Sequence, residues 1–270
     1  MSGALFAALP MYDFPHVAWA HDALWRAVAT RLRAAGVAAP DELTRGGDIA
    51  AQWRDPGLLL GQTCGYPYIT KLRDVVALVA APEYECPGCE GATHRSFLIR
   101  RADDPRRDIA AFRGATAAIN APDSNTGMNL FRAAVAPFAR RAPFFGAVVM
   151  TGAHAASVRA VAEGRADLAA IDCVSLALIG DAEPELRARL AVVAESPRLP
   201  CLPFIASAWL PDATIVATRE ALFAALADPT LAGARKALGL RGARRATPDN
   251  YEPVLAIERQ AAAAGYPHLA

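Results

Sequence analysis

One segment near the middle of the chain joins an apolar run to an amphipathic run through a short polar loop. Residues 115–120 have the length and apolar character of a buried β-strand. Residues 128–139 place their large apolar side chains at the spacing of one helix face. The loop between them closes with Ser-Asn-Thr-Gly at residues 124–127. This order predicts a strand–loop–helix unit, the building block of α/β proteins.

The same alternation extends over most of the chain. Strands are expected at residues 5–9, 58–63, 75–80, 97–100, 115–120, 148–150, 167–171, 190–194 and 204–208. Helices are expected at residues 16–35, 68–73, 128–139, 155–163, 219–227, 230–238 and 250–264. This pattern predicts an α/β fold with mainly parallel sheets flanked by helices. At 270 residues the chain is long enough for one large domain or two lobes.

The loop before residues 128–139 has two interpretations. A helix N-terminus offers backbone N–H groups and the positive end of the helix dipole, so it binds anions readily. Ser124, Asn125 and Thr126 would add side-chain donors, and Gly127 would let a ligand approach the backbone. The alternative is that Ser124 or Asn125 only caps the helix.

Several expected strand ends share this polar, glycine-rich character. In parallel sheets, ligands bind beyond the carboxyl ends of the strands. Polar turns are common in α/β proteins, which is the alternative explanation for the pattern. The segments concerned are residues 10–13, 62–66, 122–128, 151–154 and 172–175.

Two further residues at strand ends are candidates for a site. His154 follows Thr-Gly-Ala and precedes an expected helix, where an imidazole can donate to an oxyanion. A loop histidine satisfied by its neighbours is the alternative. Asp172 would accept from a ligand, orient His154, or cap the following helix.

Composition excludes several classes of function. The formal net charge is +1 and the sequence has no basic stripe, so a nucleic acid is not expected as a partner. No apolar run is long enough to span a bilayer, so membrane insertion is not expected. Residues 1–9 are apolar but lack the basic start of a secretory signal. We therefore expect either a cytoplasmic protein or an exported one whose signal is absent from this sequence.

The cysteines do not predict a metal or a disulfide framework. The five cysteines are odd in number and irregularly spaced. Cys86 and Cys89 form a CxxC motif, but no second CxxC or paired histidine accompanies it, and His94 alone cannot complete a tetrahedral site. Two incidental loop cysteines or a local disulfide are favoured over a metal site. The common nucleotide, zinc-protease and hydrolase motifs are missing as well, so we expect no cofactor.

Three segments carry a resemblance to a known family: residues 61–68 (GQTCGYPY), 124–128 (SNTGM) and 151–167, which contains Thr-Gly-x-His. Together they resemble the phosphate/phosphite/phosphonate substrate-binding proteins of ABC transporters. The resemblance implies a type II periplasmic-binding-protein fold, with a cleft between two α/β lobes. Lobe one would comprise residues 1–94 and 202–270, and lobe two residues 95–201.

The resemblance also assigns roles to residues. Ser124, Asn125 and Thr126 would hold the oxygens of the anion, and His154 matches an anion-contacting histidine. Asn125 stands where the family often has a hydroxyl residue. The remaining expected ligand contacts are Tyr12, Thr63 and Tyr66 of lobe one and Asp172 of lobe two.

These features predict a non-enzymatic, monomeric solute-binding protein that closes on phosphate, phosphite or a phosphonate. It would serve ABC-type uptake or sensing, with an ABC permease as its partner in uptake and the periplasm as its location. The alternative is an enzyme of cofactor biosynthesis on the same fold, in which Cys64, His154 and Asp172 act as nucleophile, base and orienting group. An effector domain of a regulator is disfavoured, because no DNA-binding segment is attached.

Overall fold

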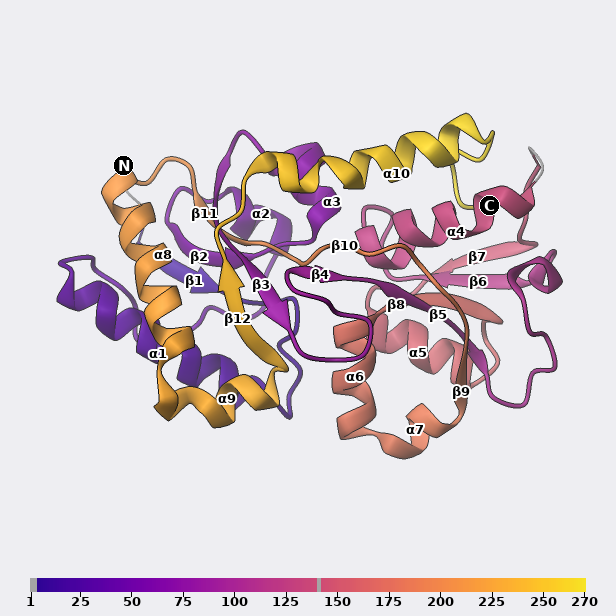
Figure 1. The fold of residues 1–270 in the computed structure, drawn as a ribbon, viewed down its shortest axis with the longest axis horizontal. Coiled ribbons are helices and arrows are strands. Elements are labelled where there is room, and N and C mark those ends of the chain that lie inside the picture. The colour runs from indigo at the N-terminus through magenta and orange to yellow at the C-terminus, as the bar shows by residue number, and fades with distance from the viewer. Residues whose placement is uncertain (1–3, 140–141) are drawn as a thin grey trace. The chain divides into compact units, whose positions relative to one another are not determined.

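A computed structural model describes residues 4–139 and 142–270 (Figure 1). The chain divides into two compact units. Unit one contains the chain up to Glu85, with Glu90–Ala92 and Pro200–Tyr251. Unit two contains Cys86–Cys89, Thr93–Leu199 and Glu252–Ala270.

Unit one is built on a five-stranded sheet. Across the sheet the strands are β1 (Phe6–Ala8), β2 (Leu58–Gln62), β11 (Phe204–Ser207), β3 (Val76–Tyr84) and β12 (Leu240–Arg244). Helix α8 lies against β2, β3 and β12, and α1 packs on both α8 and α9. The helical elements are α1 (Ala18–Ala34), α2 (Ile49–Arg54), α3 (Gly65–Pro67), η1 (Tyr68–Leu72), α8 (Asp212–Ala227), η4 (Pro229–Leu231), α9 (Ala232–Ala237) and η5 (Pro248–Tyr251).

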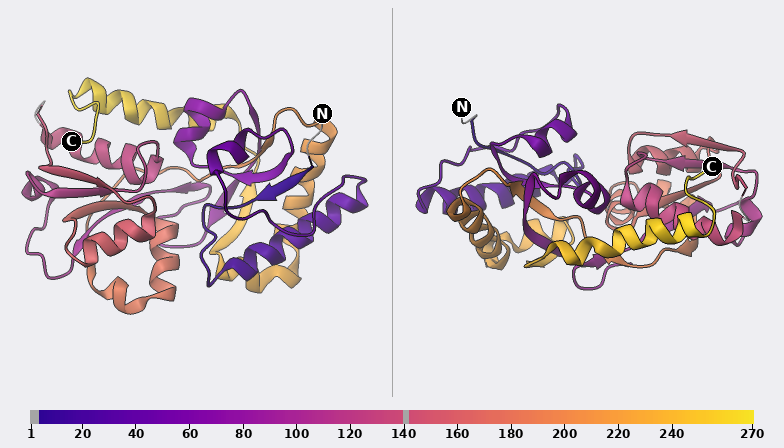
Figure 2. Two further views of the ribbon diagram at one scale, coloured as in Figure 1. Left: turned by 180° about the vertical axis from the view of Figure 1, so that it is seen from behind. Right: turned by 90° about the horizontal axis from the view of Figure 1, so that it is seen from above.

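Unit two has a second five-stranded sheet. Its strands, in spatial order, are β7 (Ala147–Met150), β6 (Thr116–Ile119), β8 (Leu168–Asp172), β5 (Ser96–Arg101) and β9 (Leu190–Glu195). Helices α4 and α10 lie on one side of this sheet, and α5 and α6 on the other (Figures 1 and 2). The helical elements are η2 (Ile109–Phe112), η3 (Asn125–Asn129), α4 (Leu130–Ala139), α5 (His154–Ala162), α6 (Cys173–Ala182), α7 (Pro184–Ala188) and α10 (Glu252–Ala263).

Most strands of each sheet run in one direction, as expected. Strands β1, β2 and β3 share a direction in unit one, and β6, β7, β8 and β9 do so in unit two. The exceptions are β11 and β12 in unit one and β5 in unit two, which run antiparallel to their neighbours. Strands β11 and β5 each follow a point where the chain passes between the units, marked by the two-residue strands β4 (Thr93–His94) and β10 (Leu199–Pro200).

The structure confirms most of the expected elements, with several differences, which include the unexpected helix α2 and the extension of β3 to Tyr84. Helix α8 begins at Asp212 rather than at residue 219. Strand β12 was not expected, because two arginines in its five residues mask the strand pattern. Helix α6 was missed because its residues are buried on most sides, so its sequence lacks an amphipathic period.

Residues 252–270 belong to unit two, whereas the family resemblance places all of residues 202–270 in lobe one. Helix α10 packs against α4 (Figure 2). Asn129 Nδ2 donates to the Val254 carbonyl at 3.1 Å, and Arg132 Nη1 donates to the Pro267 carbonyl at 2.8 Å. Ala261 and Tyr266 are buried in the core of unit two. These long-range contacts hold residues 252–270 on unit two, and the sequence does not reveal them.

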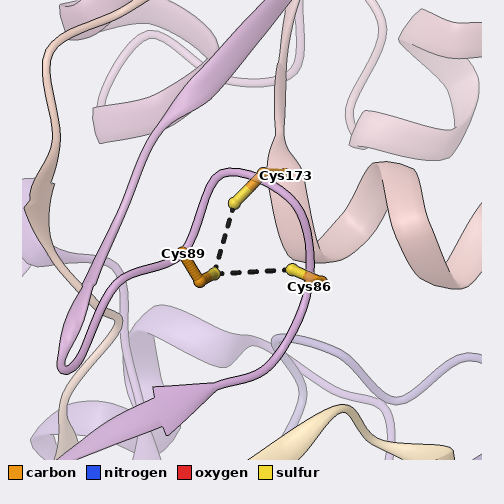
Figure 3. A group of neighbouring side chains, drawn as sticks. All are labelled: Cys86, Cys89 and Cys173. Atoms are coloured by element: carbon orange, nitrogen blue, oxygen red, sulfur yellow. Dashed lines mark hydrogen bonds between the residues drawn. The ribbon is translucent and has the colours of Figure 1, made fainter.

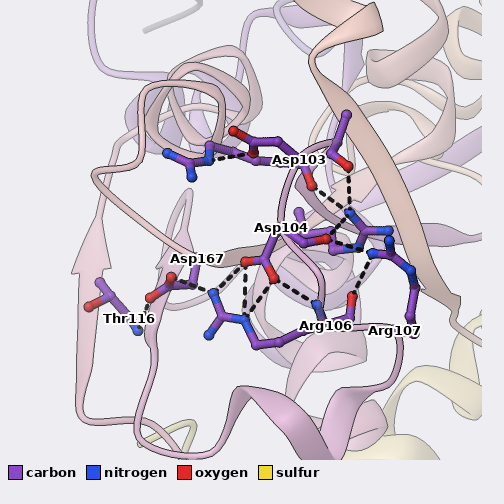
Figure 4. Close-up of polar contacts among 9 residues, drawn as sticks. Asp103, Asp104, Arg106, Arg107, Thr116 and Asp167 are labelled. Carbon is purple, nitrogen blue, oxygen red and sulfur yellow. Dashed lines mark hydrogen bonds and ion pairs between the residues drawn. The ribbon is translucent and has the colours of Figure 1, made fainter.

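A charged network at one edge of unit two fixes the starts of its central strands (Figure 4). Arg106 Nη2 bonds Asp104 Oδ2 at 2.5 Å and Asp167 Oδ1 at 2.6 Å. Asp167 Oδ2 in turn accepts from the backbone N–H of Thr116 at 2.8 Å. Because Asp167 precedes β8 and Thr116 begins β6, the network ties together the two strands whose far ends lead into the candidate site.

Within residues 4–139 and 142–270, no helix has both the length and the apolar character needed to cross a bilayer.

Candidate functional site

The helix start after β6 is built as a wide, capped turn. The Ser124 side chain accepts from the Gly127 N–H at 3.0 Å, and the Ser124 carbonyl accepts from the Asn129 N–H at 3.0 Å. The second bond spans five residues, so η3 is a π-helical turn that continues into α4. Such turns are rare and often occur at functional sites. Ser124 therefore does cap the helix, as one interpretation predicted.

Thr126 and His154 meet at this turn. Thr126 Oγ1 lies 3.0 Å from His154 Nε2. The Thr126 carbonyl accepts from Ser96 Oγ at 2.8 Å, which fixes the turn to β5. Thr126 and Ser96 are almost fully buried. Two residues from separate elements thus bring a hydroxyl and an imidazole together.

Asn125 is fully buried beneath the same turn. Its amide oxygen accepts from Asn129 Nδ2 at 3.1 Å, so Asn129 helps to fix the orientation of the Asn125 amide. Asn129 also binds the carbonyl of Val254 in α10. Helix α10 therefore helps to hold the turn in place through Asn129.

Gly127 is required by the close packing around the turn. A Cβ atom there would lie 1.8 Å from Asn120 Oδ1 and 3.1 Å from His154 Cε1. Among the described residues, the buried Asn120 Oδ1 has no hydrogen-bond partner. The absence of a side chain at Gly127 thus lets Asn120, at the end of β6, and His154 approach the turn.

His154 begins α5, in surroundings that favour the neutral imidazole. Burial lowers its pKa, and the nearby His94 adds to this effect, while Asp172 opposes it. A neutral imidazole carries one N–H donor and one acceptor nitrogen. Within the described part of the chain, its buried Nδ1 has no hydrogen-bond partner. The preceding turn is held by Thr151, whose N–H donates to the Ile119 carbonyl at 2.8 Å and whose hydroxyl lies 2.7 Å from Ser157 Oγ.

Asp172 has a partner that the sequence did not reveal. Its Oδ1 accepts from the Ser175 N–H at 2.9 Å, so it caps α6. Its Oδ2 lies 2.9 Å from Nδ1 of His94, and both side chains are buried. Burial alone would raise the pKa of Asp172, but His94, His154 and the Ser175 N–H together hold it below its ordinary value. A lone histidine on a two-residue strand gives no sequence signal for this pairing.

In unit one, two of the three expected ligand contacts are buried. Tyr12 is 2% exposed and packs edge-on against Tyr84, with ring centroids 5.3 Å apart. Thr63 is fully buried, and its N–H donates to the Pro203 carbonyl at 3.2 Å. Tyr66 is half-buried at the start of α3. Tyr12 and Thr63 therefore contribute to the core of unit one.

The sequence of the chain matches one family over most of its length. The matching family model is that of the periplasmic substrate-binding proteins of ABC phosphonate transporters, and the match covers residues 59–251. The chain belongs to this family. No curated protein sequence matches the chain.

Several solved structures have the same fold as this chain. A binding-protein component of an ABC phosphonate transporter from Pseudomonas aeruginosa has 15% identity and a TM-score of 0.74, covering 98% of this chain and 88% of that one. PhnD1 from Prochlorococcus marinus, in complex with methylphosphonate, has 12% identity and a TM-score of 0.75, covering 96% and 98%. XAC2383 from Xanthomonas citri, bound to chloride, has 16% identity and a TM-score of 0.74, covering 97% and 99%. The same XAC2383 protein is also known bound to ATP.

These likenesses confirm the expected two-lobed, type II periplasmic-binding-protein fold. The three residues that the alternative enzyme hypothesis makes catalytic come from both units of the chain. Cys64 is half-buried and precedes α3 in unit one, whereas His154 and Asp172 belong to unit two.

Proposed function

We propose that this chain is a solute-binding protein for a small phosphorus oxyanion, either phosphate, phosphite or a phosphonate. The observation that carries the proposal is the contact between Thr126 and His154 at a capped helix start. Membership of the phosphonate-binding family supports it.

The chemistry of the turn suits an oxyanion. The first turn of the helix that begins with η3 presents backbone N–H groups and the positive end of the helix dipole. The Thr126 hydroxyl and the His154 ring add donors beside it. An anion accepting from these groups would favour the protonated form of His154, whose neutrality in the free protein arises from burial.

The remaining expected contacts are proposals based on the resemblance. We propose that Ser124, Asn125 and Gly127 line the anion site together with Thr126, and that Asp172 contacts the ligand or orients His154. Further ligand contacts proposed in unit one are those of Tyr12, Thr63 and Tyr66.

We infer further that the protein acts by binding and not by catalysis, delivering its ligand to an ABC permease from the periplasm as a monomer. The family, which consists of transporter substrate-binding proteins, supports this inference. Incubation with each oxyanion, followed by phosphorus NMR, is expected to return the ligand unchanged. Iodoacetamide labelling of Cys64 at neutral pH tests the enzyme alternative, since an activated thiolate would react rapidly.

Calorimetry with phosphate, phosphite, methylphosphonate, aminoethylphosphonate and sulfate tests the binding function. We expect one of the phosphorus oxyanions to bind, and Thr126→Ala and His154→Ala each to weaken that binding by about 1–3 kcal/mol. Thr30→Ala and His16→Ala are matched controls at exposed positions and are expected to bind normally. Unchanged affinity in both site variants would remove the proposed anion site.

A further inference from the structure

Three cysteine thiols come together in unit two. Cys86 and Cys89 lie in the loop after β3, and Cys173 is the first residue of α6 (Figure 3). The Cys86 and Cys89 sulfurs are 3.4 Å apart, and the Cys89 and Cys173 sulfurs are 3.5 Å apart. All three sulfurs lie within 4.8 Å of one another. Cys173, which lies 84 residues beyond Cys89, supplies a third thiol that the CxxC motif lacks in the sequence.

The loop is shaped so that it can reach Cys173. The Cys89 N–H donates to the Cys86 carbonyl at 3.0 Å, which closes the turn. Gly88 has a φ of +99°, and a Cβ atom there would lie 2.8 Å from Cys173 Cβ and 3.0 Å from Phe97 Cζ. A side chain at Gly88 would therefore push the loop away from α6. The backbone of Cys173 is itself fixed, because its N–H donates to the Arg95 carbonyl at 3.0 Å.

The arrangement has the dimensions of a thiolate metal site. With a zinc–sulfur distance of about 2.3 Å, tetrahedral geometry places two sulfur ligands about 3.8 Å apart. The two sulfur pairs at 3.4 and 3.5 Å need only a small expansion to reach this spacing. Cys86 and Cys89 are half-buried, so an ion can reach the cluster from solvent, whereas Cys173 is buried. A local Cys86–Cys89 disulfide would require no third thiol and no glycine approach to α6.

We propose that Cys86, Cys89 and Cys173 bind one soft d10 cation. Thiolate ligands select Zn²⁺ and Cu⁺ over the hard cations Mg²⁺ and Ca²⁺. Each thiol loses its proton as its sulfur becomes a ligand. Three thiolates complete a trigonal Cu⁺ site, whereas Zn²⁺ would take a fourth ligand from solvent. The bound ion would fix the Cys86–Cys89 loop to the start of α6, one residue after Asp172.

Metal titration of the reduced, full-length protein tests the site. After treatment with a chelator, the protein is titrated with Zn²⁺ and, separately, with Cu⁺, each in competition with a chromophoric chelator. We expect one equivalent to bind, and Co²⁺ used as a probe to give sulfur-to-cobalt charge-transfer absorption. Tight binding of Zn²⁺ or of Cu⁺ identifies the ion. Failure of both to bind stoichiometrically would overturn the proposal.

Variants show whether the three cysteines form the site. Cys86→Ser and Cys173→Ser are each expected to weaken metal binding more than about tenfold. Gly88→Ala retains all five thiols and is expected to weaken binding as well, because it displaces the loop from Cys173. Cys64→Ser, at another half-buried cysteine, is the matched control and should bind normally. If Cys173→Ser does not fold, Cys86→Ser in the loop decides the outcome, and metal binding equal to that of Cys64→Ser would overturn the assignment.

Discussion

The expected site residues of unit two and those of unit one have different surroundings, although both sets follow strands. In unit two, Thr126 and His154 contact each other, and buried polar atoms beside them, Asn120 Oδ1 and His154 Nδ1, have no partner in the described part of the chain. In unit one, Tyr12 and Thr63 are packed into the core.

The neighbours of the unit-one residues explain the difference. Gln62, at the end of β2, donates through Nε2 to the Tyr84 hydroxyl at 3.0 Å and to the Leu202 carbonyl at 3.1 Å. Its amide donors are thus used within unit one. Buried polar atoms without a partner are rare in native proteins and call for an explanation. Among the described residues, unit one also leaves the buried His21 Nδ1 unmatched, so the contrast between the units rests on the Thr126–His154 contact.

The largest expected effect concerns Asp172. Asp172→Ala removes the cap of α6 and the partner of buried His94, so we expect the free energy of unfolding to fall by about 2–5 kcal/mol. Urea denaturation measures the loss. Glu220→Ala removes the exposed ion pair with Arg245 and is the control, with an expected cost of about 0–1 kcal/mol. Similar costs in the two variants would show that the buried pair contributes no more than a surface pair.

A smaller loss of stability is expected for Gly127→Ala. The added Cβ would collide with Asn120 Oδ1, so overpacking should cost about 1–3 kcal/mol and displace the turn that holds Thr126. Gly233→Ala, in helix α9 of unit one with open space around it, should be neutral or slightly stabilising. Thermal denaturation and calorimetry measure both effects. An intact ligand affinity in Gly127→Ala would show that the close packing of the turn is not needed for binding.

Two threonine substitutions compare the units directly. We expect Thr126→Val to weaken oxyanion binding by about 1–3 kcal/mol, because a hydroxyl beside His154 is lost. Thr63→Val should weaken oxyanion binding by less than about 1 kcal/mol. The Thr63 hydroxyl is buried and lies 3.5 Å from the Cys64 carbonyl, to which it donates within unit one. Calorimetry on both variants measures the difference. Equal losses would mean that unit one contributes to ligand binding as strongly as unit two.

Local patterns in the sequence predicted much of the fold and part of the site. The strand–loop–helix order around Ser124 and the position of His154 follow from short segments, and the structure agrees with both. His94 beside Asp172 and Cys173 beside Cys89 depend on contacts between residues far apart in the chain. Neither residue lies in a pattern that distinguishes it from an ordinary core residue, so only the three-dimensional structure reveals its partner.

The smallest expected effect is a pH dependence that arises from His154. Its pKa in the folded protein lies below the ordinary histidine value of about 6.5, because burial and His94 outweigh the opposing influence of Asp172. The unfolded chain therefore binds the proton more tightly, and the contribution of His154 to stability is present above pH 6.5 and lost as the pH falls below it.

An oxyanion at His154 would favour the protonated ring, so ligand affinity should rise as the pH falls through the same window. Calorimetry between pH 5 and 8 on the wild type and on His154→Gln separates this effect from the ionisation of the ligand, which is the same in both proteins. The buried His21 also has a lowered pKa and contributes to the stability profile of both proteins equally, so the difference between them isolates His154. Parallel affinity profiles for the two proteins would place the bound anion away from His154 and leave the helix start as the remaining candidate for the anion site.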